Sequence, residues 1–559
     1  MVRRQATLTD RPGATSRQPS AAPPTPARGW TRQLLWCGAI FALLLIAYWC
    51  NGSVLVGNDA KPNVYLPLSL LREGNLSFTP QEVPFMFSWR AKTQAGVQPI
   101  NFGSWDASMS GYTTRQLVRM GVIYGPKPRY YITQSARNGP DGQPLYVSTF
   151  GPGAGLAALP VIAAARALGD VDNDGALMWN AAKLAAAMLV AGSAVFVFAT
   201  ARLYTTPLRS AVLALGYALG TCVWSISSQS LWQHGPNSFF LAMGSYFLLR
   251  GRRDGRWVWP LLCGLAYSAA VACRPTSVLV AVAAGAYLLA VSRRQLAMYV
   301  LGALPIALAL AGYNHYYLGA PWRFGQAQAG RTVAMQKTGS EDLWSTPLLE
   351  GAAGLMVSPS RGLLVHSPVV LVAAAGLVLA ARRRQWAMLP LLAATAGLWV
   401  IAFKWFDWWG GWCYGYRPLV DTMPLLAVLA IPAMDWLFAR RWALAGAGVL
   451  LGWSVLVQVV GAFAYDVSSW NAGVDRFEVL LPGQKTPAVI SDAQRLEEVL
   501  ARYPGAQVNE IRLDIDEPRN RHRLWSVRNS QILYYLQNFS ECCAKRREDS
   551  AIWVHQPSG

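Results

Sequence analysis

Long apolar segments alternate with short, arginine-rich turns along most of the chain. An α-helix needs about 20 predominantly apolar residues to cross the hydrocarbon core of a bilayer. We therefore predict an all-α polytopic membrane protein with about 11 transmembrane helices, large outer loops and a C-terminal outer tail of mixed structure. The predicted spans are residues 34–54, 180–201, 210–228, 236–249, 257–272, 276–292, 295–313, 363–381, 386–403, 418–438 and 442–462.

One further apolar segment, residues 153–168, does not fit the alternation. If it crossed the membrane, the acidic residues Asp170, Asp172 and Asp174 that follow it would be cytoplasmic. Every later arginine turn would then lie outside, against the positive-inside rule. We predict a re-entrant or interfacial helix here.

Charge gives the orientation of the chain. The protein has 53% hydrophobic and 14% charged residues and a formal net charge of +20. A basic protein of this kind could suggest a nucleic-acid partner, but the excess arginines lie before the first apolar segment and in the short turns, which is the positive-inside pattern. We therefore expect no nucleic acid, a plasma (inner) membrane location and a cytoplasmic N-terminus. The turn arginines are Arg202, Arg209, Arg250, Arg252, Arg253, Arg256, Arg293, Arg294, Arg382, Arg383, Arg384, Arg440 and Arg441.

The same pattern divides the chain into three regions. Residues 1–29 are rich in Pro, Ala, Arg, Ser and Thr and have no apolar periodicity, which predicts a disordered cytoplasmic tail. Residues 30–465 form the transmembrane domain, with 55–179 as its first outer loop. Residues 466–559 form a C-terminal extracytoplasmic region, in which 491–503 predict a capped amphipathic helix and 523–540 a helix on the membrane surface.

The first outer loop begins with a candidate catalytic acid. Asp59 lies just beyond the first predicted span, ahead of a segment with Pro62 and an amphipathic pattern that ends at Gly74. One interpretation is structural, with Asp59 as the N-cap of the following helix and Pro62 in its first turn. The other is functional, with the carboxylate as a general base for an incoming hydroxyl at the membrane surface. The two interpretations are compatible.

A set of basic residues falls at the outer ends of the predicted spans. Each could snorkel to the interface or pair with an acid of an outer loop. As a set they are unexpected there, because the positive-inside bias depletes arginine on the outer side. Arginine presents a planar fork that suits phosphate oxygens, so we predict an anion-binding group. Its members are Arg274, Arg417, Arg361, His234 and Lys404.

An aromatic segment, residues 405–416, precedes Arg417. Its central Gly-Gly pair breaks helical periodicity, which predicts a loop at the mouth of a cavity. Its aromatic residues fit an interfacial belt, or Trp409 and Tyr414 could contact a sugar ring or an isoprenoid chain. Asp407 and Asp421 could bind hydroxyls or pair with Lys404 and Arg417.

Taken in order, several short motifs resemble the GT-C superfamily of membrane glycosyltransferases, which includes protein mannosyltransferases and aminoarabinose transferases. After Asp59 come Tyr146–Gly153, Cys273-Arg274-Pro275-Thr276, Asn314–Pro321 with Phe324-Gly325, Ser367-Pro368, and Trp408–Arg417. The similarity extends over much of residues 34–465. It implies a polyprenyl-phosphate sugar as donor and an essential acid in the first outer loop, at the position of Asp59.

The residues and the resemblance together predict an inverting sugar transfer at the extracytoplasmic face, with Asp59 as the general base. Arg274 and Arg417 would hold the leaving phosphate, and the acceptor would be an envelope glycan, a lipid or a protein. Many family members carry two adjacent acids in the first loop, whereas Asp59 stands between Asn58 and Ala60. The sequence therefore supports no metal or other cofactor, although the family pattern would allow a divalent metal. The alternative from another class is a transporter or flippase of lipid-linked sugars.

Overall fold

The computed structural model describes residues 26–554, except 80, 84–85, 87, 94–95, 102–130, 140–141, 173 and 485. The predicted disordered tail, residues 1–29, lies outside the described residues apart from 26–29, which belong to the first helix.

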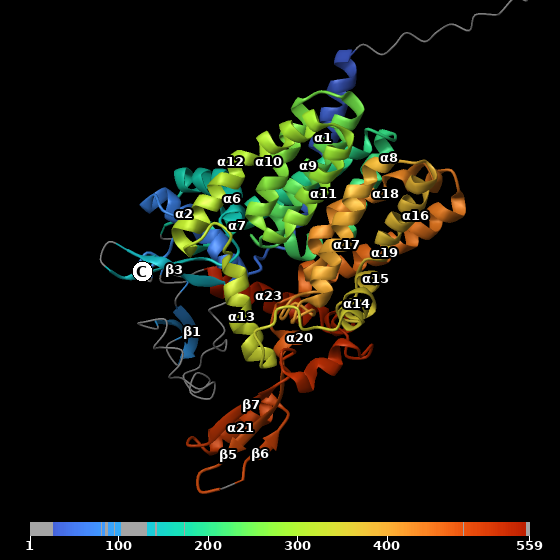
Figure 1. The fold of residues 1–559 in the computed structure, drawn as a ribbon. Coiled ribbons are helices and arrows are strands. Elements are labelled where there is room, and N and C mark those ends of the chain that lie inside the picture. Colours follow the sequence, from blue (N-terminus) through green and yellow to red (C-terminus); the bar gives the residue numbers. More distant parts are fainter. Residues whose placement is uncertain are drawn as a thin grey trace, which may run out of the picture.

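Long apolar helices form a bundle in which the arginine-rich turns share one end (Figure 1). Each predicted span overlaps one of these helices, and the segment predicted as re-entrant forms α6. The spans 210–228 and 363–381 also include shorter helical segments, so their helices are shorter than predicted. The helices are α1 (Pro26–Trp49), α6 (Gly153–Leu168), α7 (Gly175–Ala201), α8 (Pro207–Gly220), α9 (His234–Asp254), α10 (Val258–Cys273), α11 (Val278–Val291), α12 (Arg293–Leu318), α16 (Leu371–Arg382), α17 (Leu389–Lys404), α18 (Met423–Phe438) and α19 (Arg441–Ala464).

Six of these segments are long and apolar enough to cross a membrane by length and composition. They are Thr31–Trp49, Gly175–Ala201, Arg293–Leu318, Trp386–Lys404, Arg417–Phe438 and Arg441–Ala464. The protein is therefore a multi-pass helical membrane protein. Of the other helices, α9 has 21 residues but is less apolar, and the rest are shorter. The count of eleven spans therefore stays a prediction, as does the re-entrant course of α6.

Helix α18 lies at the centre of one half of the bundle. It packs against α16, α8, α7, α9, α17 and α19. Its residues from Met423 to Met434 are all buried, because neighbouring helices cover every side of it. A rigid, enclosed α18 fixes the position of the short 3-10 helix η7 (Arg417–Thr422) that leads into it.

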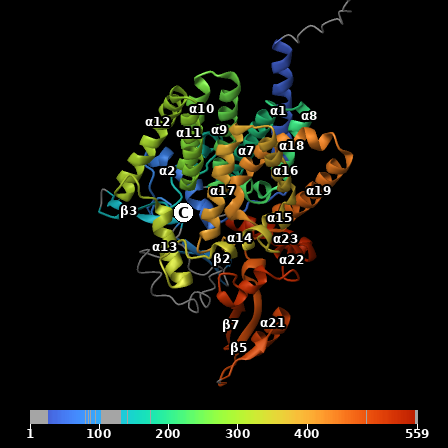
Figure 2. The same ribbon diagram turned by 45° about the vertical axis from the view of Figure 1, so that its right-hand side comes forward.

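The end of the bundle opposite the arginine turns carries short helices and strands (Figures 1 and 2). The first outer loop contributes η1 (Asn58–Ala60), α2 (Lys61–Glu73) and two antiparallel hairpins, β1 (Ser88–Thr93) with β2 (Gly96–Asn101) and β3 (Ile132–Asn138) with β4 (Pro144–Ser148). The sequence analysis did not predict these strands. Later outer segments add α13 (Gly325–Thr338), α14 (Leu348–Val357) and α15 (Leu363–His366), followed by η5 (Pro368–Val370).

The C-terminal region combines a small sheet with helices, as expected of mixed structure. Strands β5 (Val474–Leu480), β6 (Ala488–Ile490) and β7 (Gln507–Arg512) pair antiparallel in the order β6-β5-β7 and project away from the bundle (Figure 1). The predicted capped helix is confirmed as α21 (Ala493–Arg502), with Asp492 accepting a hydrogen bond from the Gln494 amide.

The rest of this region folds back onto the bundle through α20 (Ser469–Ala472), η8 (Pro518–Leu524), α22 (Gln531–Gln537) and α23 (Phe539–Val554). The prediction of one surface helix over 523–540 is wrong. The helix is interrupted at Trp525–Ser530, and Gln531, Ile532 and Tyr535 of α22 are buried. These three side chains pack against protein, including α19, and do not form an exposed face.

Candidate functional site

Asp59 lies in the short turn η1, where the chain leaves the first span, and faces Arg417. Its Oδ2 atom is 2.8 Å from Nη1 of Arg417, and both side chains are largely buried. Its Oδ1 atom is buried and has no hydrogen-bond partner among the described residues. Helix α2 begins after Ala60 and receives no side-chain cap, so the N-cap interpretation of Asp59 is wrong. The carboxylate pairs with a distant arginine and keeps one oxygen for another donor.

Arg417 opens η7 and is fixed from three directions. Besides the pair with Asp59, its Nη2 donates to the carbonyl of Gly410 at 2.9 Å, and its guanidinium lies 5.2 Å from the centre of the Trp232 ring. The carbonyl can reach it because the loop turns back at Gly410 and Gly411, whose φ angles of +73° and +62° favour glycine. The predicted loop over 405–416 is thereby confirmed as non-helical.

A second polar cluster surrounds Asp421, one turn further along η7. Its carboxylate pairs with Nε of Arg274 at 2.6 Å and with Nδ1 of His234 at 3.1 Å. Asn237 donates to the same carboxylate at 2.9 Å and accepts a hydrogen bond from Ser277. Asp421 therefore pairs with Arg274 and His234, and the predicted pairing with Lys404 or Arg417 is wrong.

The structure thus brings together four of the predicted site residues. Arg274 directly follows α10, His234 begins α9, Arg417 lies in η7 and Asp59 in η1. The two clusters are linked through η7, which carries both Arg417 and Asp421. Two carboxylates and two guanidinium groups consequently come together in a largely buried site, where Coulomb interactions are stronger than in water.

Arg361 has other neighbours. It is fully buried, and its guanidinium donates to the carbonyls of Trp409, Gly411 and Ser360 and to the side chains of Gln531 and Asn471. These contacts join the aromatic loop to the C-terminal region. The described contacts therefore show that Arg361 stabilises the packing of the loop against the C-terminal region. Its binding of substrate stays a prediction.

The two aromatic candidates are enclosed by protein. Trp409 is 2% exposed. Its indole donates to Asp516, and Arg521 lies 4.2 Å from its ring centre. Tyr414 is fully buried and donates to the carbonyl of Val457 at 2.7 Å. Neither ring forms an exposed belt, and contact with a sugar or an isoprenoid stays a prediction.

Lys404 ends α17 and is half-buried; within the described residues its ammonium makes no hydrogen bond or ion pair. The lysine that pairs with the aromatic loop is Lys337 of α13. Its ammonium lies 2.5 Å from the carboxylate of Asp407 and 2.8 Å from that of Asp516. Burial opposes its charge, but the two carboxylates outweigh it and hold the pKa of Lys337 above its usual value. Asp407 thus pairs with Lys337, not with Lys404 or Arg417 as predicted.

Some residues of this region were not identified from the sequence. Lys337 and Asp516 lie in outer segments without a motif, and nothing in their spacing connects them to residue 407. Trp232 could have been noticed, because it stands two residues before His234 at the start of α9. Across the described ranges, no group of three or more His, Cys, Asp or Glu side chains is placed to hold a metal ion. The predicted lack of a cofactor stays a prediction.

No protein-family model matches the chain, and no curated protein matches it significantly. Among solved structures, it is similar to the crystal structure of ArnT from Cupriavidus metallidurans bound to undecaprenyl phosphate. That similarity has a TM-score of 0.41 and 13% sequence identity, and covers 79% of this chain and 72% of that chain. A likeness at this level concerns the course of the chain and assigns no role to any residue.

Proposed function

We propose that this protein is a GT-C type glycosyltransferase that moves a sugar from a polyprenyl-phosphate donor to an acceptor hydroxyl on the outer face of the membrane. The observation that carries the proposal is the carboxylate of Asp59. One of its oxygens pairs with Arg417, and the other is buried without a hydrogen-bond partner among the described residues. A buried oxygen of this kind is suited to accept the proton of a bound hydroxyl.

The reaction that fits this arrangement is a single displacement. The acceptor oxygen attacks the anomeric carbon as its proton passes to Oδ1 of Asp59. The bond from the anomeric carbon to the phosphate oxygen breaks on the opposite face, and its electron pair leaves with the polyprenyl phosphate. The configuration at the anomeric carbon is therefore inverted.

Arg417 is suited to hold the leaving phosphate. Its guanidinium already binds an anion, the Asp59 carboxylate, at 2.8 Å, and a phosphate presents oxygens that match the same fork. Fixed positive charge next to a leaving group stabilises the transition state. Arg274 supplies a second positive charge at the same end of the bundle, where Asp421 and His234 hold it in place.

The orientation belongs to the proposal as well. The arginine turns lie at the end of the bundle opposite the strands and short helices, such as α13 and β3 (Figure 1), and the positive-inside rule assigns that end to the cytoplasm. The site would then face the outside of the plasma membrane, where the acceptor is an envelope glycan, a lipid or a protein.

The test begins with a strain that lacks the gene and is complemented with the parent chain, Asp59→Asn or Glu73→Gln. Glu73 ends α2 with its side chain 40% exposed, so it is a matched outer acid away from the site. We expect lipid-linked sugar to accumulate in the deletion strain and with Asp59→Asn, but not with Glu73→Gln. General-base assistance is typically worth about 10²–10⁴ in rate, which sets the expected loss for Asp59→Asn.

The accumulated lipid-linked sugar is then given to the purified proteins. Release of polyprenyl phosphate by the parent chain separates the enzyme from the alternative, a transporter or flippase, which would move the lipid intact. Full activity of an Asp59→Asn protein that inserts normally would contradict the role of Asp59, and a product of retained configuration would contradict the single displacement.

A further inference from the structure

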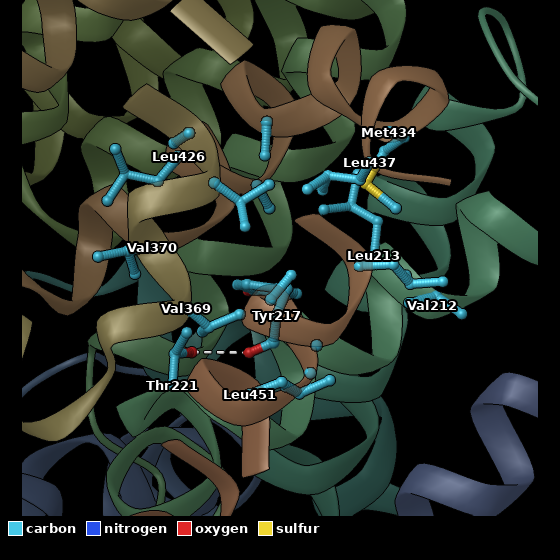
Figure 3. Close-up of a pocket in the computed structure, with 18 of the residues that line it drawn as sticks. Val212, Leu213, Tyr217, Thr221, Val369, Val370, Leu426, Met434, Leu437 and Leu451 are labelled. Atoms are coloured by element: carbon cyan, nitrogen blue, oxygen red, sulfur yellow. Dashed lines mark hydrogen bonds between the residues drawn. The ribbon is translucent and has the colours of Figure 1, made fainter. Parts of the chain in front are cut away.

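An apolar crevice lies between α8, α16, α18 and α19 (Figure 3). It measures about 130 Å³ and is lined by apolar side chains such as Leu213, Leu426, Met434 and Leu451. Apolar cavities of about this size stay dry and accept apolar ligands. The crevice opens at α19, where Gly448 is exposed and has no atom within 4 Å of the place where a side chain would begin.

The outer end of the crevice offers nothing to a charged headgroup. Its polar lining residues are Thr221 and Tyr217, which Figure 3 shows bonded to each other. The Thr221 hydroxyl donates to the Tyr217 carbonyl at 2.7 Å, and the Tyr217 hydroxyl contacts Ser193 at 2.9 Å. No charged side chain is among the lining residues. A ligand with a phosphate must therefore enter from the opposite end.

That opposite end is rimmed by arginines. Arg209 precedes Leu213 by one turn of α8 and lies 5.5 Å from the ring centre of Phe438, which lines the crevice. Arg441 precedes the lining residue Leu444 by one turn of α19, so the two share a helix face.

Nearby tryptophans mark the same level of the membrane. Trp442 is 70% exposed and packs edge-on against Trp436, over which Arg440 lies at 5.1 Å. Asp435 pairs with Arg209 at 2.7 Å, and the described residues give no ion pair of an acid with Arg440 or Arg441. Tryptophan and arginine together are typical of the headgroup level of a bilayer.

The crevice follows most of the length of α18. Its lining residues there run from Met423 to Phe438, a rise of about 22 Å, so the crevice is deep enough for the extended part of an acyl chain that enters at the arginine end. We propose that this crevice binds one acyl chain of an anionic phospholipid from the cytoplasmic leaflet, whose headgroup phosphate contacts Arg440 and Arg441. The proposed phosphate contacts of this lipid, Arg440 and Arg441, follow the end of α18, whereas Arg417 of the proposed donor site precedes its start, so the two phosphates would lie at opposite ends of this helix.

The test uses native mass spectrometry of the full-length protein in detergent with equal amounts of phosphatidylglycerol and phosphatidylcholine. We expect the parent to prefer phosphatidylglycerol by about tenfold or more, since each arginine near an anionic surface contributes about 1 kcal/mol. Gly448→Phe fills the crevice and should reduce binding of both lipids about tenfold. Gly446→Phe is the matched control, because Gly446 has equally open space but does not line the crevice.

The double variant Arg440→Gln with Arg441→Gln should lose the preference for phosphatidylglycerol, while Arg293→Gln with Arg294→Gln should keep it. This pair decides the question even if Gly448→Phe does not fold. Equal binding of the two lipids to the parent, or equal effects of the two glycine variants, would overturn the proposal. The proposal would also be overturned if Gly448→Phe lost binding of added undecaprenyl phosphate but kept binding of phosphatidylglycerol. The Asp59→Asn protein should bind the phospholipid normally, which keeps this test independent of the proposed enzyme activity.

Discussion

Asp421 shows how one buried carboxylate organises the candidate site. It is 3% exposed and holds Arg274, His234 and Asn237 through separate contacts. Removing one partner of a buried ion pair leaves the other charge uncompensated, which costs far more than losing a surface pair. The carboxylate therefore positions the second arginine of the site without contacting Asp59 itself.

We predict that Asp421→Asn destabilises the protein by about 3–5 kcal/mol, because the charge of Arg274 stays buried without its partner. The measurement is thermal unfolding of the purified protein in detergent. Asp435→Asn is the matched control, since Asp435 also pairs with an arginine but is 48% exposed; it should cost about 0–1 kcal/mol. Equal midpoints for Asp421→Asn and the parent would show that Arg274 does not depend on this carboxylate.

At the scale of elements, the helices of the C-terminal region are part of the bundle. Arg361 holds α22 through Gln531, and Arg546 holds α23. The Arg546 guanidinium is 2% exposed and donates to Ser53, Gln229 and the carbonyls of Gly461 and Tyr465. Because Ser53 lies in the segment that leads to Asp59, α23 supports the start of the first outer loop.

We predict that Arg546→Gln loosens α23, since hydrogen bonds to a charged group contribute about 1.5–3 kcal/mol each and buried acceptors would lose their donor. Limited proteolysis should cleave the C-terminal region faster, and the unfolding midpoint should fall. The neighbouring Arg547 is exposed, so Arg547→Gln is the control and should behave like the parent. If both variants are cleaved at the parent's rate, α23 is held by its other contacts.

At the scale of the whole molecule, charge and fold agree on two distinct ends. The arginine turns gather at one end, and the outer-loop elements and the C-terminal sheet lie toward the other (Figures 1 and 2). The proposed orientation follows from this separation and the positive-inside rule, and it places the phosphates of the two proposed lipids at opposite faces of the membrane.

We predict opposite labelling of two single-cysteine variants by a membrane-impermeant maleimide. Both are made in a Cys50→Ala background, because Cys50 is an exposed native thiol. Val489→Cys, at a 61% exposed position of β6, should react while the membrane is intact. Arg382→Cys, at the last residue of α16, should react only after permeabilisation. The background protein gives the baseline, and labelling of both variants from the same side would contradict the separation of the two ends.

Hydropathy and capping patterns within short segments of the sequence were sufficient to locate the long helices. Apolar length placed all the predicted segments on helices, and the Asp492 cap and amphipathic spacing gave α21. The two hairpins of the first outer loop and the break before α22 were not predicted, because short segments take their structure from the surfaces they pack against.

The sequence by itself determined that the chain is a helical membrane protein, where its helices lie and which end carries the positive charge, because hydropathy and charge act over neighbouring residues. Only the tertiary structure decided that Asp59 meets Arg417 across 358 residues, that Asp421 pairs with Arg274 instead of Lys404, and that Trp409 and Tyr414 are enclosed. Such contacts depend on which faces of separate helices meet, and a carboxylate takes whichever cation the packing brings within reach. Composition and residue spacing therefore do not predict which cation pairs with each carboxylate.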